Sequence, residues 1–210
     1  MTSDEGRIQR AQEQPIVGGL PDVPGILTAI RLTPELGVHL RGLANELLVN
    51  DFPGATISRF EREVLATAVS AANDCYFCMD SHAAHATAVA ELLGETDQLH
   101  LLEPIQAGSS EGFSPKMQAL LHISRTVQSA PRTLTAADIA RAHEEGASDA
   151  DVQLAVLIAA GFSMYNRLVD GFRARTPPST DAYRTRAAEI AEHGYGPPPT
   201  PSLAGGNGRS

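Results

Sequence analysis

Helix start signals recur along the chain and constrain its fold more than any other feature. Thr33-Pro34 and Ser114-Pro115 each place a capping hydroxyl before a proline at the first helical position. Ser58 stands three residues before Glu61, and Ser148 three residues before Asp151, the spacing of a capping box, in which each side chain bonds the backbone N–H of the other residue. Asn73 or Asp74 is a good N-cap for the helix that begins at Cys75. These signals and the apolar periodicity predict helices over residues 34–49, 58–72, 75–93, 97–105, 114–129, 135–145, 152–172 and 180–193, after a short apolar run at 24–30.

A strand pattern of alternating apolar and polar residues is convincing nowhere in the sequence. The apolar run 154–162 is the one stretch where a buried strand remains an alternative to a helix. Aromatic residues make up only 5% of the chain while alanine and leucine abound, which favours helices packed closely through small side chains. We therefore predict an all-α fold.

Composition narrows the class of protein. With 210 residues, 42% of them hydrophobic, the chain can bury a full core, in one domain or in two tightly packed halves. A formal net charge of −9 argues against general affinity for nucleic acid or anionic membranes. Neither a signal peptide nor a run of about 20 apolar residues is evident, so we expect a cytoplasmic protein. The expected organisation is a flexible arm at 1–15, a helical domain at 16–195 and a disordered tail at 196–210.

The only two cysteines, Cys75 and Cys78, stand at C-x-x-C spacing. Because the cytosol keeps nearby thiols reduced, such a pair is more typical there of catalysis or metal binding than of a structural disulfide. His82 follows Cys78 by four residues, and on a helix these offsets place all three residues on one face, which His85 continues. This stretch is the predicted centre of the chemistry.

Two arguments about the attacking thiol point to different residues. The N-terminus of a helix favours a thiolate most at Cys75, whereas a histidine one turn beyond Cys78 can take the proton of Cys78. Burial opposes both effects because it disfavours charge. The residues alone leave the attacking thiol open.

Zinc binding is a competing use of cysteine and histidine. Along one straight helix, however, about 15 Å of rise separates Cys75 from His85, too far for one ion with ligand bonds of about 2.0–2.3 Å. We therefore expect no metal at this site.

Glu63 is an acidic residue at the head of an otherwise apolar run. If the chain turns back at Asn73-Asp74, this carboxylate can lie against His82, fix the tautomer of the imidazole and raise its basicity. The residues alone favour the plainer alternative, a solvated glutamate in the first turn of a helix.

The run from Glu63 to His82, EVLATAVSAANDCYFCMDSH, resembles the alkyl hydroperoxidase D-like, peroxidase-related branch of the carboxymuconolactone decarboxylase superfamily. That branch is marked by a glutamate twelve residues before a C-x-x-C and a histidine four residues after its second cysteine. All four positions match, and Ser70 falls where the family often has serine. The similarity extends from about residue 34 to about residue 172.

The resemblance implies a compact bundle of about eight helices that assembles into homotrimers or hexamers and binds no cofactor. It implies a thiol-dependent peroxidase that reduces alkyl hydroperoxides, with Cys78 as the attacking thiol, Cys75 as the resolving thiol, and Glu63 and His82 as a proton relay. An electron-donor protein carrying a dithiol, of the lipoamide or thioredoxin type, would restore the pair. A non-enzymatic redox sensor or disulfide carrier of the same fold, and a helical scaffold with a vestigial dithiol, remain alternatives.

Phe77 departs from the family pattern, since some of these hydroperoxidases have a second histidine directly before the second cysteine. The departure implies a shorter relay or a more apolar substrate. Arg167 and Asp170 are more typical of contacts between helices or subunits than of catalysis. No partner is visible in the sequence for the remaining histidines, which we expect at the surface or hydrogen-bonded in the core: His39, His100, His122, His143 and His193.

A weak internal repeat is one further interpretation of the second half. Sliding Glu63-Val64 onto Asp151-Val152 would set the dithiol stretch against residues 163–170. Few identities support this register, so chance similarity between two alanine-rich helices is the favoured interpretation.

Overall fold

The computed structural model describes residues 3–196, which are all-α and contain no strand, as predicted. Ten α-helices follow one another along this part of the chain, eight of them longer than six residues. Their bounds are α1 Ser3–Gln12, α2 Leu27–Leu32, α3 Pro34–Leu48, α4 Arg59–Ala72, α5 Tyr76–Leu93, α6 Leu102–Gln106, α7 Pro115–Ser129, α8 Ala136–Glu144, α9 Asp149–Gly171 and α10 Arg184–His193. Short 3-10 turns lie at Thr96–Leu101, Pro131–Thr133 and Thr180–Tyr183.

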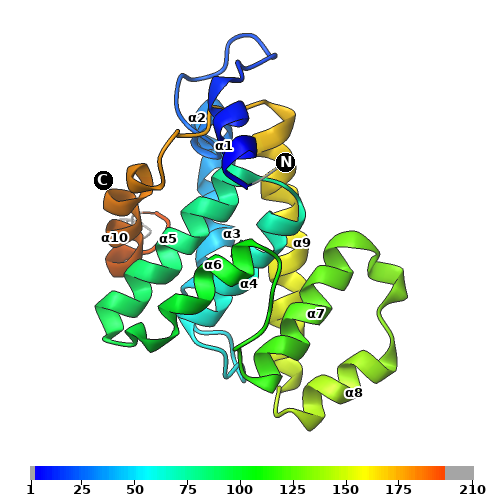
Figure 1. Ribbon diagram of the computed structural model, residues 1–210. Coiled ribbons are helices and arrows are strands. Elements are labelled where there is room, and N and C mark those ends of the chain that lie inside the picture. The colour runs from blue at the N-terminus through cyan, green and yellow to red at the C-terminus, as the bar shows by residue number, and fades with distance from the viewer. Residues whose placement is uncertain (1–2, 197–210) are drawn as a thin grey trace, which may run out of the picture.

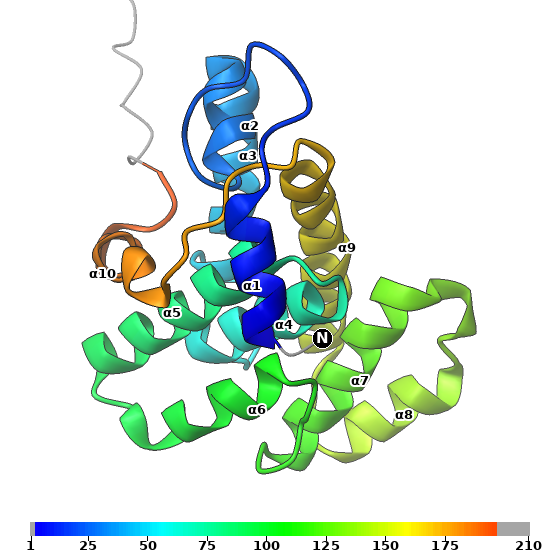
Figure 2. The same cartoon turned by 45° about the horizontal axis from the view of Figure 1, so that its top comes forward.

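Helices α4 and α5 form the centre of the bundle (Figure 1). They pack against each other, and α7 and α9 cover another side of α4. Helix α10 lies along α5, while α3 packs against α9 and α4. Helix α8 packs on α7 and extends away from the main body (Figures 1 and 2). Segments from both ends of the chain therefore surround α5.

The predicted capping boxes are confirmed. Ser58 accepts from the N–H of Glu61 while the Glu61 carboxylate accepts from the N–H of Ser58 at 2.7 Å. Ser148 and Asp151 form the same reciprocal pair at the start of α9. Because these bonds satisfy N–H groups that have no partner inside the helix, each box fixes where its helix begins.

The break between α4 and α5 differs from expectation in one detail. Asn73 ends α4 as its C-cap, Asp74 adopts a left-handed conformation with φ of 55°, and Cys75 itself is the N-cap of α5. The prediction that Asn73 or Asp74 caps the second helix is therefore wrong. Asparagine and aspartate tolerate the left-handed region better than most residues, so this pair reverses the chain instead of capping it.

The flexible arm predicted for residues 1–15 is also wrong over residues 3–12, which form helix α1. Figure 2 shows α1 lying across α5. Arg7 holds it there, because its guanidinium donates to both oxygens of the buried Asp80 carboxylate, at 2.6 and 2.9 Å. A polar segment can be ordered by such a bidentate pair without an apolar core of its own. The predicted tail at 196–210 lies outside the described residues except for Gly196.

Residues 154–162 lie within the continuous helix α9, so the strand alternative is wrong. Length and composition alone would allow α9 to cross a membrane, but half of its most apolar window is buried inside the bundle, against α4 and α7.

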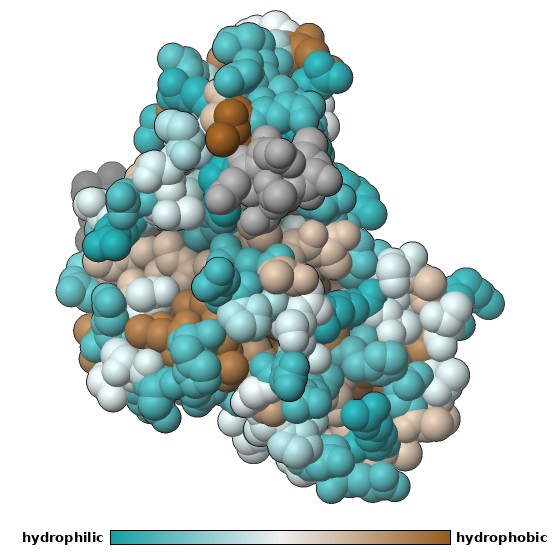
Figure 3. Space-filling model, viewed as in Figure 1, coloured by the Kyte–Doolittle hydropathy of each residue, from teal (hydrophilic) through white to brown (hydrophobic). Residues whose placement is uncertain are grey.

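On the face shown in Figure 3, hydrophobic side chains emerge in separate patches, one of them over α5 and α6. In the weak internal repeat considered from the sequence, α9 would correspond to the end of α4 and the start of α5. Helix α9 is continuous, whereas a turn separates α4 from α5, so the two halves of the chain do not have matching helices.

Candidate active site

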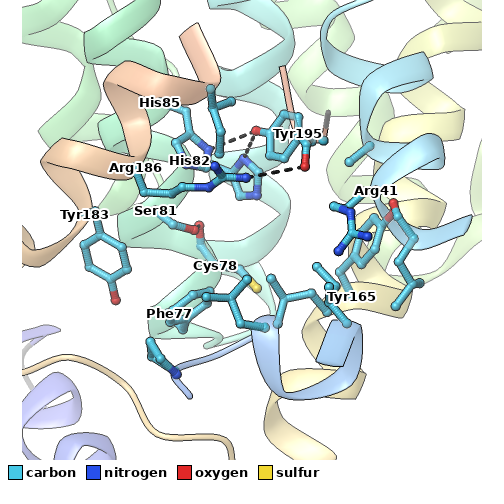
Figure 4. Close-up of a pocket in the computed structure, with 18 of the residues that line it drawn as sticks. Arg41, Phe77, Cys78, Ser81, His82, His85, Tyr165, Tyr183, Arg186 and Tyr195 are labelled. Atoms are coloured by element: carbon cyan, nitrogen blue, oxygen red, sulfur yellow. Dashed lines mark hydrogen bonds between the residues drawn. The ribbon is translucent and has the colours of Figure 1, made fainter. Parts of the chain in front are cut away.

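The dithiol lies at the start of α5, with both cysteines buried and not bonded to each other. Cys78 lines a cavity of about 780 Å³, together with His82 one helical turn further along (Figure 4). Cys75 is fully buried behind it and is not part of the cavity wall. The two thiols therefore differ in access: a small molecule can reach Cys78 first.

A polar network holds the Cys75 side of the site. The backbone N–H of Cys75 donates to the Ser70 carbonyl at 3.0 Å. The Asn166 amide, from α9, donates to the Ser70 hydroxyl at 3.1 Å and accepts from the amide of Asn73 at 2.8 Å. Ser70, which the resemblance had singled out, thus anchors the turn that carries the first cysteine. Asp170 also lies near Cys75, and burial raises the pKa of its carboxyl.

The surroundings of Cys75 oppose its ionisation. Its hydrogen bond with Cys78, followed by burial and by the negative charges of Cys78 and Asp170, raises the pKa of the Cys75 thiol. The helix N-terminus acts in the opposite direction, but at a fully buried position desolvation outweighs it. Cys75 therefore stays protonated, which favours Cys78 as the nucleophile of the pair.

Glu63 and His82 meet as the family pattern implied. Oε2 of Glu63 lies 2.7 Å from Nδ1 of His82, and both side chains are buried. The alternative of a solvated glutamate in the first turn of a helix is therefore wrong. The capping box begins at Ser58, so Glu63 falls on the inner face of α4. A carboxylate on Nδ1 leaves Nε2 as the free nitrogen of His82.

Two further residues complete this cluster, and sequence reasoning gave neither a role in it. The Tyr195 hydroxyl, contributed by the segment after α10, lies 2.7 Å from Oε1 of Glu63, 2.9 Å from Nδ1 of His85 and 3.3 Å from Nδ1 of His82. Figure 4 shows Tyr195 and the two histidines pointing toward one another. His85 was visible in the sequence as a continuation of the helix face, whereas Tyr195 carried no local signal.

Hydrogen counting fixes the protons of the cluster. Burial and the neighbouring Glu63 carboxylate raise the pKa of Tyr195 well above its usual value, so its single proton stays and is donated to Glu63. The hydroxyl can then only accept from His85, whose Nδ1 must carry a hydrogen. Burial, followed by repulsion from His82 and Arg186, lowers the pKa of His85 well below its usual value and keeps that ring neutral.

The same cluster has the composition of a metal site. Ligand atoms of Glu63, His82 and His85 lie within 4.8 Å of one another. The expectation of no metal rested on the distance from Cys75 to His85 and did not consider this set. In this arrangement the Nδ1 atoms of both imidazoles lie against hydrogen-bond partners within the cluster, so the possible ligand atoms are used in hydrogen bonds to one another.

Phe77 shapes the cavity wall. Its ring packs edge-on against Tyr183, with centroids 5.5 Å apart, and the chain passes directly over it at Gly25. A side chain at Gly25 would overlap the Phe77 ring, and its φ of 55° also favours glycine. Where relatives carry a second histidine, this chain therefore has an apolar wall.

The other residues considered from sequence lie apart from the cluster. Arg167 donates to the carbonyl of Ser163 within its own helix. Of the remaining histidines, His193 lines the cavity. The other four have local partners or are exposed: His39, His100, His122 and His143.

Known proteins resemble this chain in part of its sequence and in its fold. Residues 34–99, which span α3 to α5, match the sequence model of the Carboxymuconolactone decarboxylase family. A peroxidase-related protein of Ralstonia eutropha JMP134, described as an alkylhydroperoxidase AhpD core, has a TM-score of 0.64 at 22% identity, over 79% of this chain and 82% of that one. A peroxidase-related protein of Silicibacter sp. TM1040 gives 0.63 at 22% identity, over 82% and 93%. No curated protein matches the sequence significantly.

The fold is similar to that of these two peroxidase-related proteins. The family match covers α3 to α5, the part of the chain that carries the Glu63-to-His82 motif.

Proposed function

We propose that the protein is a thiol-dependent peroxidase that reduces organic hydroperoxides through Cys78 and Cys75. One observation carries the proposal. Of the two thiols only Cys78 opens to the cavity, and the same cavity wall presents His82, whose far nitrogen is held by a buried carboxylate. A nucleophile, a base and a group that orients the base are the components of an activated thiol.

In the first step His82 accepts the Cys78 proton at Nε2, directly or through one water. The thiolate attacks the terminal oxygen of the hydroperoxide, the O–O bond breaks, and the alkoxide takes a proton from His82. Cys78 becomes a sulfenic acid and an alcohol leaves. Glu63 stabilises the transient imidazolium through its bond to Nδ1.

In the second step the Cys75 thiol condenses with the sulfenic acid, giving a disulfide and water. An external dithiol then reduces the disulfide and is itself oxidised. Because Cys75 is fully buried, the reductant would enter through the cavity and attack the sulfur of Cys78. We propose a protein-borne dithiol of the lipoamide or thioredoxin type as this partner.

The test is consumption of cumene hydroperoxide with a dithiol donor in excess. We expect Cys78→Ser to abolish turnover. Cys75→Ser should react once and accumulate a sulfenic acid at Cys78, detected by mass spectrometry after trapping with dimedone. Ser163→Ala, which removes a buried hydroxyl without a partner among the described residues, serves as the matched control.

Other results would decide against the enzyme. Oxidation of the wild type without turnover, across several dithiol donors, would identify a redox sensor or disulfide carrier. If neither thiol reacted with hydroperoxide, the remaining interpretation would be a helical scaffold with a vestigial dithiol.

We further propose that the protein acts in the cytoplasm as a homotrimer or homohexamer. Large apolar side chains are exposed on α3 and α9, among them Val38, Leu157 and Met164, and contacts between subunits would cover such groups. Light scattering after size exclusion measures the mass of the assembly, and a mass of one chain would exclude it.

A further inference from the structure

We propose that the cavity is built for an amphipathic carboxylate, so that the preferred substrate class is the fatty-acid hydroperoxides. The last part of this inference rests on the proposed function. The cavity of about 780 Å³ is within the range of sites that enclose small organic ligands. It is large for a hydroperoxide of a few carbon atoms.

The inner walls of the cavity are apolar. Ile26 precedes helix α2, which contributes Ile30, while α3 contributes Leu40 and Ala44 and α9 contributes Phe162. Tyr165 adds the face of its ring, since its hydroxyl already donates to the Leu40 carbonyl at 2.7 Å. An alkyl chain lying against these walls would gain about 0.8 kcal/mol for each methylene removed from water.

The cavity wall carries more positive than negative charge. Arg186 is matched, because it donates to the Glu189 carboxylate at 2.9 Å and to the Tyr195 carbonyl at 3.4 Å. Arg41 and Arg31 also line the cavity, and within residues 3–196 neither forms an ion pair or a hydrogen bond. A chain with a net charge of −9 thus places two unmatched cations at one cavity.

Figure 4 shows Arg41 and Cys78 on different sides of the cavity, with its apolar walls between them. A ligand that satisfies both ends has an anionic head at Arg41, an alkyl chain along α2, α3 and α9, and a reactive oxygen near Cys78. Guanidinium binds carboxylate in a planar, two-bond geometry that suits such a head group. Phe77 supports the assignment, because an apolar wall replaces a second histidine beside the thiol.

Binding can be tested without the peroxidase chemistry. Calorimetry on the full-length Cys78→Ser variant would compare decanoate with decan-1-ol, which have the same chain and differ in head group. We expect decanoate to bind about tenfold more tightly, the order of one charge-assisted hydrogen bond at a half-exposed site. Arg41→Gln should remove the difference, while Arg132→Gln, at an exposed arginine outside the cavity, should leave it. Equal affinities for the two ligands would overturn the proposal.

Turnover separates this inference from the proposed function. We expect kcat/KM for linoleic acid hydroperoxide to exceed that for its methyl ester, with Arg41→Gln lowering only the former, by about tenfold. Arg132→Gln, outside the cavity, should leave the rate with either substrate unchanged. Equal rates for acid and ester would contradict the carboxylate subsite while leaving a peroxidase. Charge-dependent decanoate binding without turnover of any hydroperoxide would contradict the peroxidase while supporting the subsite.

Discussion

Glu63 and Asp151 are both buried carboxylates, and they are satisfied in different ways. Asp151 accepts from the backbone N–H groups of Ser148, Thr56 and Ile57 and from the Thr56 hydroxyl. Within residues 3–196 Glu63 accepts only from side chains, those of His82 and Tyr195. Backbone donors cannot change protonation or move away, whereas imidazole and phenol groups can exchange protons. The carboxylate bound by titratable side chains is the one placed for chemistry.

Among changes that leave both thiols in place, removing the charge of Glu63 should have the largest effect on activity. In Glu63→Gln the amide can still accept from Tyr195 and can donate to Nδ1 of His82, which moves the imidazole proton to Nε2. The base is then lost while hydrogen bonds remain, so we expect kcat/KM to fall by about 10²- to 10⁴-fold and stability to change by less than about 1 kcal/mol. Peroxidase assays and urea unfolding measure the two. A variant that keeps most of its activity would make Glu63 structural, like Asp151.

Removing Asp151 should instead cost stability. Asp151→Ala leaves buried N–H groups unsatisfied and deletes a capping box, so we expect a loss of about 2–4 kcal/mol in the free energy of unfolding. The control is Asp149→Ala, an exposed acid in the same helical turn, which should cost no more than about 1 kcal/mol. If the folded Asp151→Ala protein lost its peroxidase activity, the division between the two carboxylates would fail.

Tyr195→Phe tests the side of Glu63 that faces away from His82. It removes the donor to Oε1 and the acceptor of His85, so we expect kcat/KM to fall by about tenfold. Tyr183→Phe is the matched control, because its hydroxyl is buried without a partner among residues 3–196; that change should leave activity and stability nearly unaltered or raise stability slightly. Equal activity of the two variants would remove Tyr195 from the relay.

The smallest expected effect is a difference in acid stability. Burial tends to raise the pKa of Asp151, but the hydrogen bonds from Ser148, Thr56 and Ile57 outweigh it and lower the pKa below that of the unfolded chain, about 3.9. The stabilisation is therefore complete above about pH 4 and is lost as the pH falls through the folded value. Urea unfolding from pH 6 to pH 2.5 should show wild type approaching Asp151→Asn at the acid end. A constant gap between them would contradict this linkage.

Local signals in the sequence were enough to predict most helices, because caps such as Ser58 and Ser148 act over three residues. The meeting of Glu63 with His82 was implied by the family resemblance, whereas the residues alone favoured a solvated glutamate. Tyr195 was not predictable, since 110 residues separate it from His85 and only the packing of α10 on α5 brings it back. The docking of α1 was missed for the same reason: Arg7 and Asp80 pair across 73 residues.

Tyr195 makes the segment after α10 a component of the candidate active site. The Asn45 side chain accepts from its backbone N–H at 2.7 Å, so the segment after α10 is fixed to α3 as well as to the cluster. Proteolysis ahead of this residue would remove the hydrogen-bond partner of Glu63 and His85. Limited digestion with carboxypeptidase would therefore test the contribution of Tyr195. An affinity tag is better attached at a site far from this segment.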